Sequence, residues 1–180
     1  MSSKLPLTWI VLIGFMAALS IAALADLEPD ESSFVFGSAH EHASILIKIH
    51  DDPYDLTQER FQLTSPYIHL ENSNGHVIHR HSEYVRLSYF FDILNLGLTK
   101  DCFTFDDKRE FCTNDDYSLK FFINGKKVDD IRNYLIFDGD LILVSYGDEG
   151  PEQIKHQLKE LKDKGFPFQL REEISPYLNV

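Results

Sequence analysis

Twenty-one consecutive residues without a charged side chain, from Leu5 to Ala25, set the start of this sequence apart from the rest. At about 1.5 Å per residue, a helix of that length spans roughly 30 Å, the thickness of a membrane's hydrocarbon core. Four acidic residues follow at once, within positions 26–31. The pattern predicts that residues 1–25 form a transmembrane helix and take no part in a globular core.

The orientation of this segment follows from its only nearby cation, Lys4, which lies on its N-terminal side. The positive-inside tendency then places the N-terminus in the cytoplasm and the rest of the chain outside. Alternatively, the segment is a signal peptide cleaved after Ala23-Leu24-Ala25, whose small residues suit a signal peptidase. We therefore expect either a single-pass protein of the cell membrane or a secreted one, with the bulk of the chain outside the cytoplasm.

The remaining sequence divides by composition into three parts. Residues 26–38 form an acidic, Ser-rich linker, residues 39–149 a β-rich extracytoplasmic domain, and residues 150–180 an amphipathic helix and tail. In that helix, Ile154, Leu158 and Leu161 share one face, which suits docking on the domain or on a partner.

The overall charge limits the classes of partner. Lys and Arg number 17 and Asp and Glu 29, so the net charge is −12, and nucleic acid would be repelled. Hydrophobic residues make up 43%, too many for a disordered chain. The sequence predicts a folded, acidic domain whose partners are a membrane and possible membrane protein complexes.

The order of the predicted elements indicates an α+β domain, a mixed β-sheet with one packed helix. Apolar and polar residues alternate along 42–50, as in a half-buried strand, and apolar residues recur at helical spacing along 87–96, with Gly97 as the stop. The order hairpin, helix, strand, turn, strand resembles a β-grasp, ubiquitin-like domain. Further strands are predicted at 61–63, 67–71, 76–81, 119–123, 127–128 and 140–146.

The only two cysteines, Cys102 and Cys112, bracket the run CFTFDDKREFC. A three-residue turn at positions 106–108 would set them directly opposite each other in a hairpin, at a distance that a disulfide bridges. We expect a structural disulfide, worth about 2–3 kcal/mol. Reduced thiols are the alternative.

Histidine is concentrated in one region. A three-residue loop at positions 73–75, with Gly75 in the left-handed conformation, would pair His69 with His79 and put Ile68, Leu70 and Ile78 on the buried face. The other face then carries His69, Glu71, His79 and His81, while His40 and His42 share one side of the first strand. In all, seven of the eight histidines lie between residues 40 and 81: His40, His42, His50, His69, His76, His79 and His81.

Two His-x-His pairs on adjacent strands would supply several imidazoles to one metal ion. Zn²⁺ takes three or four such nitrogens in a tetrahedron, and Cu²⁺ takes a planar set with higher affinity. We therefore predict a Cu²⁺ or Zn²⁺ site formed by His40, His42, His79 and His81, with His69 as a further ligand. The alternatives are hydrated surface histidines and a pH-responsive face.

Four stretches of the chain together carry a resemblance to known proteins: GSAHEHASILIKI (37–49), VIHRHSEYVRLSYFFDILNLGL (77–98), CFTFDDKREFCTNDDYSLKFFINGKKV (102–128) and IRNYLIFDGDLILVSYGDE (131–149). They resemble a group of small exported, membrane-anchored, His-rich proteins of ammonia-oxidising archaea. The resemblance implies an anchored extracytoplasmic domain with paired histidines and a disulfide. Some relatives carry the label protein-disulfide isomerase, but Cys102 and Cys112 lack the close spacing of that motif.

Together these patterns predict a membrane-anchored metal-binding domain with no catalytic residues. Copper delivery to an external membrane enzyme is one form that this function could take. The alternative is a non-catalytic assembly or adaptor subunit of a membrane complex. A thiol enzyme like protein-disulfide isomerase is a third interpretation.

Overall fold

A computed structural model describes residues 31–165, and two long strands lie at its centre. Strands β1 (Glu41–Ile49) and β10 (Asp140–Gly147) run parallel, with Ile45 opposite Ile142 and Ile47 opposite Val144. The chain divides into two units, residues 1–33 and 34–180. In the first unit the structure describes only the turn η1 (Glu31–Ser33), and the sheets and helices all belong to the second.

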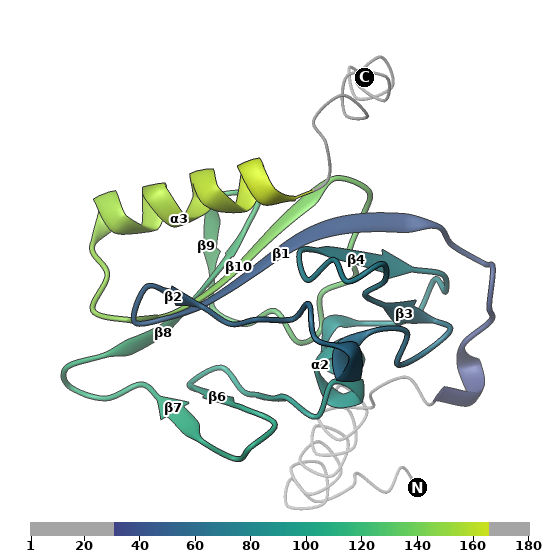
Figure 1. Ribbon diagram of the computed structural model, residues 1–180, viewed down its shortest axis with the longest axis horizontal. Coiled ribbons are helices and arrows are strands. Elements are labelled where there is room, and N and C mark those ends of the chain that lie inside the picture. Colours follow the sequence, from purple (N-terminus) through teal and green to yellow (C-terminus); the bar gives the residue numbers. More distant parts are fainter. Residues whose placement is uncertain (1–30, 166–180) are drawn as a thin grey trace, which may run out of the picture. The chain divides into compact units, whose positions relative to one another are not determined.

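The other strands extend this pair on both sides into a mixed sheet, in the order β3-β4-β1-β10-β8-β9, with β2 paired to β1 (Figure 1). Apart from β1 and β10, all pairs in it are antiparallel. The added strands are β2 (Asp52–Pro53), β3 (Ile68–His69), β4 (Val77–Arg80), β8 (Ser118–Ile123) and β9 (Lys126–Val128). The α+β class with a mixed sheet is confirmed.

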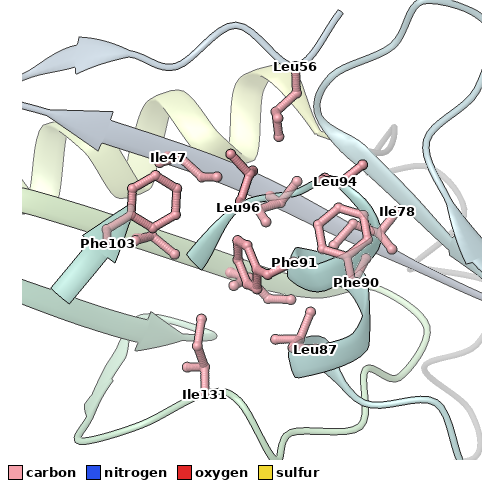
Figure 2. Packing of buried hydrophobic residues seen from close by; sticks show 14 of the residues in the cluster. Ile47, Leu56, Ile78, Leu87, Phe90, Phe91, Leu94, Leu96, Phe103 and Ile131 are labelled. Carbon is pink, nitrogen blue, oxygen red and sulfur yellow. The ribbon is translucent and has the colours of Figure 1, made fainter. Parts of the chain in front are cut away.

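One face of the sheet is covered by helix α2 (Leu87–Ile93), which buries Leu87, Phe90 and Phe91 completely or nearly so. Figure 2 shows these side chains meeting Ile47 and Ile78 from the sheet and Phe103 from a neighbouring hairpin. The alternation predicted for the first strand is confirmed, because Ala43, Ile45, Ile47 and Ile49 all belong to this core.

A second helix, α3 (Pro151–Lys164), covers the opposite face, so the expectation of one packed helix was incomplete (Figure 1). Its apolar side chains Ile154 and Leu161 pack on Leu46 and Leu143. A buried ion pair joins the same layers, with 2.8 Å between Lys48 Nζ and Glu160 Oε2. Both faces of the central strands are therefore buried.

A smaller sheet of three strands carries the cysteines. It consists of β5 (Gly97–Leu98), β6 (Cys102–Thr104) and β7 (Glu110–Cys112). Cys102 lies opposite Cys112, with Cα atoms 4.0 Å apart, and the disulfide is formed, as predicted. Lys108 takes the left-handed conformation that closes the three-residue turn.

Three local predictions were wrong. Positions 61–63 are not a strand, because Phe61 ends the 3₁₀ turn η2 (Glu59–Phe61) and Leu63 is left-handed. Helix α2 ends before Gly97, because Asn95 takes the left-handed conformation first.

In the histidine hairpin, the left-handed residues are Asn72 and Ser73, and not Gly75. Gly75 is instead required because a Cβ there would lie 2.8 Å from the carbonyl carbon of Leu56.

Phe34 is buried against Tyr67 and Tyr89. Gly37 then donates a backbone hydrogen bond to His81, 2.8 Å long. Within residues 31–165 no helix is long and apolar enough to span a membrane. The membrane segment predicted at 1–25 lies outside the described residues, as does the tail after residue 165.

Candidate metal centre

The strand pairing brings histidines from three separate strands into one row. His42 on β1 lies opposite His79 on β4, and His79 lies opposite His69 on β3. The predicted pairing of His69 with His79 is therefore confirmed. Side chains on a strand alternate between its two faces. His40, two residues before His42, and His81, two residues after His79, therefore lie on the same face as this row.

The five imidazoles form a closed circuit in which each lies next to two others. We call this set (His40, His42, His79, His69 and His81) the histidine ring. Between ring centroids, the successive distances are 4.9 Å (40 to 42), 4.7 Å (42 to 79), 5.8 Å (79 to 69), 5.1 Å (69 to 81) and 5.0 Å (81 to 40). The structure thus gathers all five of the predicted site residues.

Burial within the histidine ring is graded. His69 is 7% exposed, and His42 and His79 are half-buried with side-chain exposures of 18% and 17%. His40 is exposed, and the exposed Phe36 lies beside His81, with ring centroids 5.8 Å apart. The site is therefore closed at His69 and open to solvent at His40, which leaves a path for an ion to enter.

Hydrogen bonds fix the tautomer of two members. Asp138 Oδ1 lies 3.1 Å from His42 Nδ1, and the Ser65 carbonyl oxygen lies 2.8 Å from His69 Nδ1. Carboxylate and carbonyl oxygens only accept, so each Nδ1 must carry the proton and donate it. In the neutral ring the lone pair is then on Nε2, and this arrangement of outer hydrogen bonds is the one that orients metal-binding histidines.

A carboxylate lies between two of the imidazoles. Glu71 Oε2 is 3.7 Å from His69 Nε2, and Glu71 Oε1 is 3.6 Å from His79 Nε2. Glu71 is half-buried, and its negative charge would offset part of the charge of a divalent cation. It would serve as an oxygen ligand or as an outer acceptor.

The protonation state also suits ligation. Burial, together with the other imidazoles, lowers the pKa of His79 from 6.5 to about 4, although Glu71 opposes the shift. Burial and the neighbouring histidines likewise lower the pKa of His81. Both rings are neutral at pH 7, the state in which an imidazole nitrogen binds a metal.

The spacing of the rings can be compared with that of histidines sharing one ion. With metal to nitrogen distances of about 2.0–2.1 Å, two imidazole centroids are about 5.2 Å apart in a tetrahedron and about 4.5 Å at adjacent corners of a square plane. Four of the five neighbouring distances, 4.7 to 5.1 Å, lie between or near these values. Within residues 31–165, however, no three His, Cys, Asp or Glu side chains present a ready coordination sphere. Rotation of the imidazoles would be needed to point their nitrogens at one ion.

The other described histidines stand apart from this site. His50 packs on Tyr117 and Tyr146, and His156 is exposed on α3. Sequence reasoning missed Asp138 and Ser65, which fix the two tautomers. Asp138 is 96 positions from His42, so no local pattern could have indicated their contact.

Comparisons of the chain with protein-family models, with curated proteins and with solved structures give no match. The resemblance to exported archaeal proteins therefore stays a prediction from the four sequence stretches.

Proposed function

We propose that this protein is a membrane-anchored extracytoplasmic domain that binds Cu²⁺ or Zn²⁺ through the histidine ring. The observation that carries the proposal is the contact of five imidazoles from three adjacent strands. A structural role for the cluster explains it poorly, because neighbouring imidazoles disfavour one another's protonation. A shared cation would bind the neutral imidazoles together.

The choice of metal follows from general affinity orders. Imidazole suits both ions, and for a given nitrogen site Cu²⁺ binds more tightly than Zn²⁺. No Cys or Met lies in the histidine ring, and this argues against a site specialised for Cu⁺. We propose copper delivery to an external membrane enzyme as the role to test first.

Calorimetric titration of the purified full-length protein with Cu²⁺ and with Zn²⁺ tests the proposal. We expect one ion per chain, bound more tightly than micromolar, which is about −8 kcal/mol. The double variant His79→Ala/His81→Ala should abolish this binding. The matched variant His156→Ala, which removes an exposed imidazole outside the histidine ring, should bind as the original chain does. Weaker than micromolar binding of both metals would reject the proposal.

The strand order supports assigning the domain to the β-grasp class. The first long strand and the last strand are adjacent, parallel and central, each is flanked by an antiparallel strand, and α2 falls between the two halves in sequence. In this proposal β3, β2 and the three-stranded sheet are additions to the basic fold. The added β3 is the strand that supplies His69.

An assembly or adaptor subunit of a membrane complex is the second candidate function. It is favoured by exposed apolar side chains, since Val35, Phe36 and Phe137 are each at least 57% exposed. The apolar face of α3 is already buried on its own sheet, so a partner would use other surfaces. In this case His79→Ala/His81→Ala would leave capture of a membrane partner intact, whereas the metal proposal predicts loss of function.

A further inference from the structure

A cavity separate from the histidine ring lies between the end of β1, the β2 segment and the tip of the β6–β7 hairpin. Its volume is about 670 Å³, within the range of small-molecule sites. The side chains Tyr54, Phe105 and Phe111 line it. Tyr54 stacks on Phe105 with centroids 4.4 Å apart, and Phe105 contacts Phe111 at 4.8 Å. One wall of the cavity is thus a continuous row of three aromatic rings.

The charges around the cavity favour a cation. Four carboxylates and two guanidinium groups line it. Both guanidinium groups are already neutralised, because Arg60 Nε lies 2.8 Å from Asp106 Oδ2 and Arg109 Nε lies 2.8 Å from Asp107 Oδ2. Of the two remaining carboxylates, neither Asp52 nor Asp55 forms an ion pair among residues 31–165. Asp55 Oδ1 accepts hydrogen bonds from the backbone N–H and the hydroxyl of Thr57, which leave its negative charge in place.

The aromatic wall already holds one cation. The guanidinium carbon of Arg109 lies 4.7 Å from the centroid of the Phe105 ring. This is cation–π geometry, in which the negative face of a ring attracts positive charge. The ring of Phe111 continues the same wall, and the net charge of −12 attracts cations to the whole molecule.

From the cavity, its aromatic wall and the two carboxylates that form no ion pair, we infer that this protein binds a small organic cation, an ammonium or guanidinium group carried on an apolar skeleton. The apolar part lies against Tyr54 and Phe111, and the charge faces Asp52 and Asp55. This site is independent of the histidine ring and needs no metal.

Calorimetry and ligand-observed NMR on the metal-free full-length protein in non-ionic detergent test the inference. The probe is benzyltrimethylammonium at low ionic strength, with benzoate as the anionic comparison. We expect saturable one-to-one binding of the cation and none of benzoate. Benzoate binding as tightly as the cation would show that the arginines govern the site, and this would overturn the inference, as would the lack of saturable cation binding.

Three variants locate the site. Asp52→Asn/Asp55→Asn should weaken cation binding about tenfold, and Phe111→Leu, which keeps an apolar side chain but removes the ring, about fivefold. Asp115→Asn/Asp116→Asn makes the same change in net charge on an exposed loop outside the cavity lining and should leave binding within about twofold. Equal weakening by the two charge-removing double variants would mean that the cation binds to the general negative surface, and the inference would be wrong.

Discussion

A single imidazole on a strand is an ordinary surface residue, and its chemistry here depends on what its neighbours supply. His42 is the clearest case, because its two nitrogens have different surroundings. Its Nδ1 donates to Asp138, and its ring lies 4.7 Å from that of His79. The carboxylate both orients the ring and increases the basicity of the other nitrogen.

The role of Asp138 gives the first prediction. Asp138→Ala should weaken Cu²⁺ or Zn²⁺ binding about 10–100-fold, since loss of an outer partner of a ligating histidine usually costs this much. Calorimetric titration measures the change. Asp130→Ala is the control, since Asp130 lies in the same region of sequence but pairs with Arg132. Equal affinities for the original chain and the Asp138 variant would contradict a ligand role for His42.

The second prediction concerns pH. Because burial lowers the folded-state pKa of His79 from 6.5 to about 4, the unfolded chain binds a proton at His79 in this window and the folded chain does not. The free energy of unfolding of the metal-free protein should therefore fall as the pH drops from about 6.5 to about 4, and His81 adds to the effect in the same direction.

Urea denaturation at pH 7 and pH 5 measures this dependence. The part due to His79 should be on the order of 1 kcal/mol, because the ring is partly exposed to solvent. His79→Gln should reduce the difference between the two pH values. An identical difference in that variant would show that other groups cause it.

Among the secondary-structure elements, α3 illustrates how charge and apolar packing combine. Its apolar residues Ile154 and Leu161 bury Leu46 and Leu143, and Glu160 reaches the buried Lys48. Lys48 points away from the α2 core, as the strand alternation requires, so without α3 its ammonium group would be in water.

Removal of the carboxylate gives the third prediction. Glu160→Gln should lower the free energy of unfolding by about 1–3 kcal/mol, because it leaves the Lys48 ammonium group largely buried without its nearest counter-charge. Lys159→Met on the same helix breaks only the exposed pair with Asp163 and should cost less than about 0.5 kcal/mol. Chemical denaturation measures both, and equal losses in the two variants would contradict a buried role for Lys48.

The β6–β7 hairpin gives the fourth prediction. Cys102→Ala/Cys112→Ala should lower the free energy of unfolding by about 2–3 kcal/mol through loss of a cross-link over a short loop.

Because acidic residues raise the pKa of nearby thiols, we also expect no isomerase activity from the original chain. Turnover of a scrambled disulfide substrate that vanished in a Cys102→Ser variant would show that the pair is catalytic.

At the scale of the whole molecule, local patterns predicted the strands and their pairing better than they predicted long-range contacts. Alternation and turn length placed His69 opposite His79 and Cys102 opposite Cys112, because a slip of one residue would expose a buried face. The reason for a glycine at position 75 could not be predicted, since it is the close approach of the Leu56 backbone, which is distant in sequence.

The candidate site was predictable in its members but not in its surroundings. The five imidazoles follow from two His-x-His pairs and one hairpin, all within residues 40–81. Asp138 and the Ser65 carbonyl come from loops whose position depends on the tertiary fold. The sequence predicted that the apolar face of α3 would dock either on the domain or on a partner. It could not distinguish the two, and the structure shows that α3 packs on its own sheet.

X-ray absorption spectroscopy of the zinc-loaded full-length protein tests whether the histidine ring binds the metal, because it counts the ligands around the ion. We predict at least three imidazole nitrogens at about 2.0–2.1 Å, with the multiple-scattering pattern of histidine. His79→Ala/His81→Ala should lose this pattern, and His156→Ala should keep it. A first shell made of oxygen ligands, or one with fewer than three imidazoles, would contradict the claim that the histidine ring holds the metal.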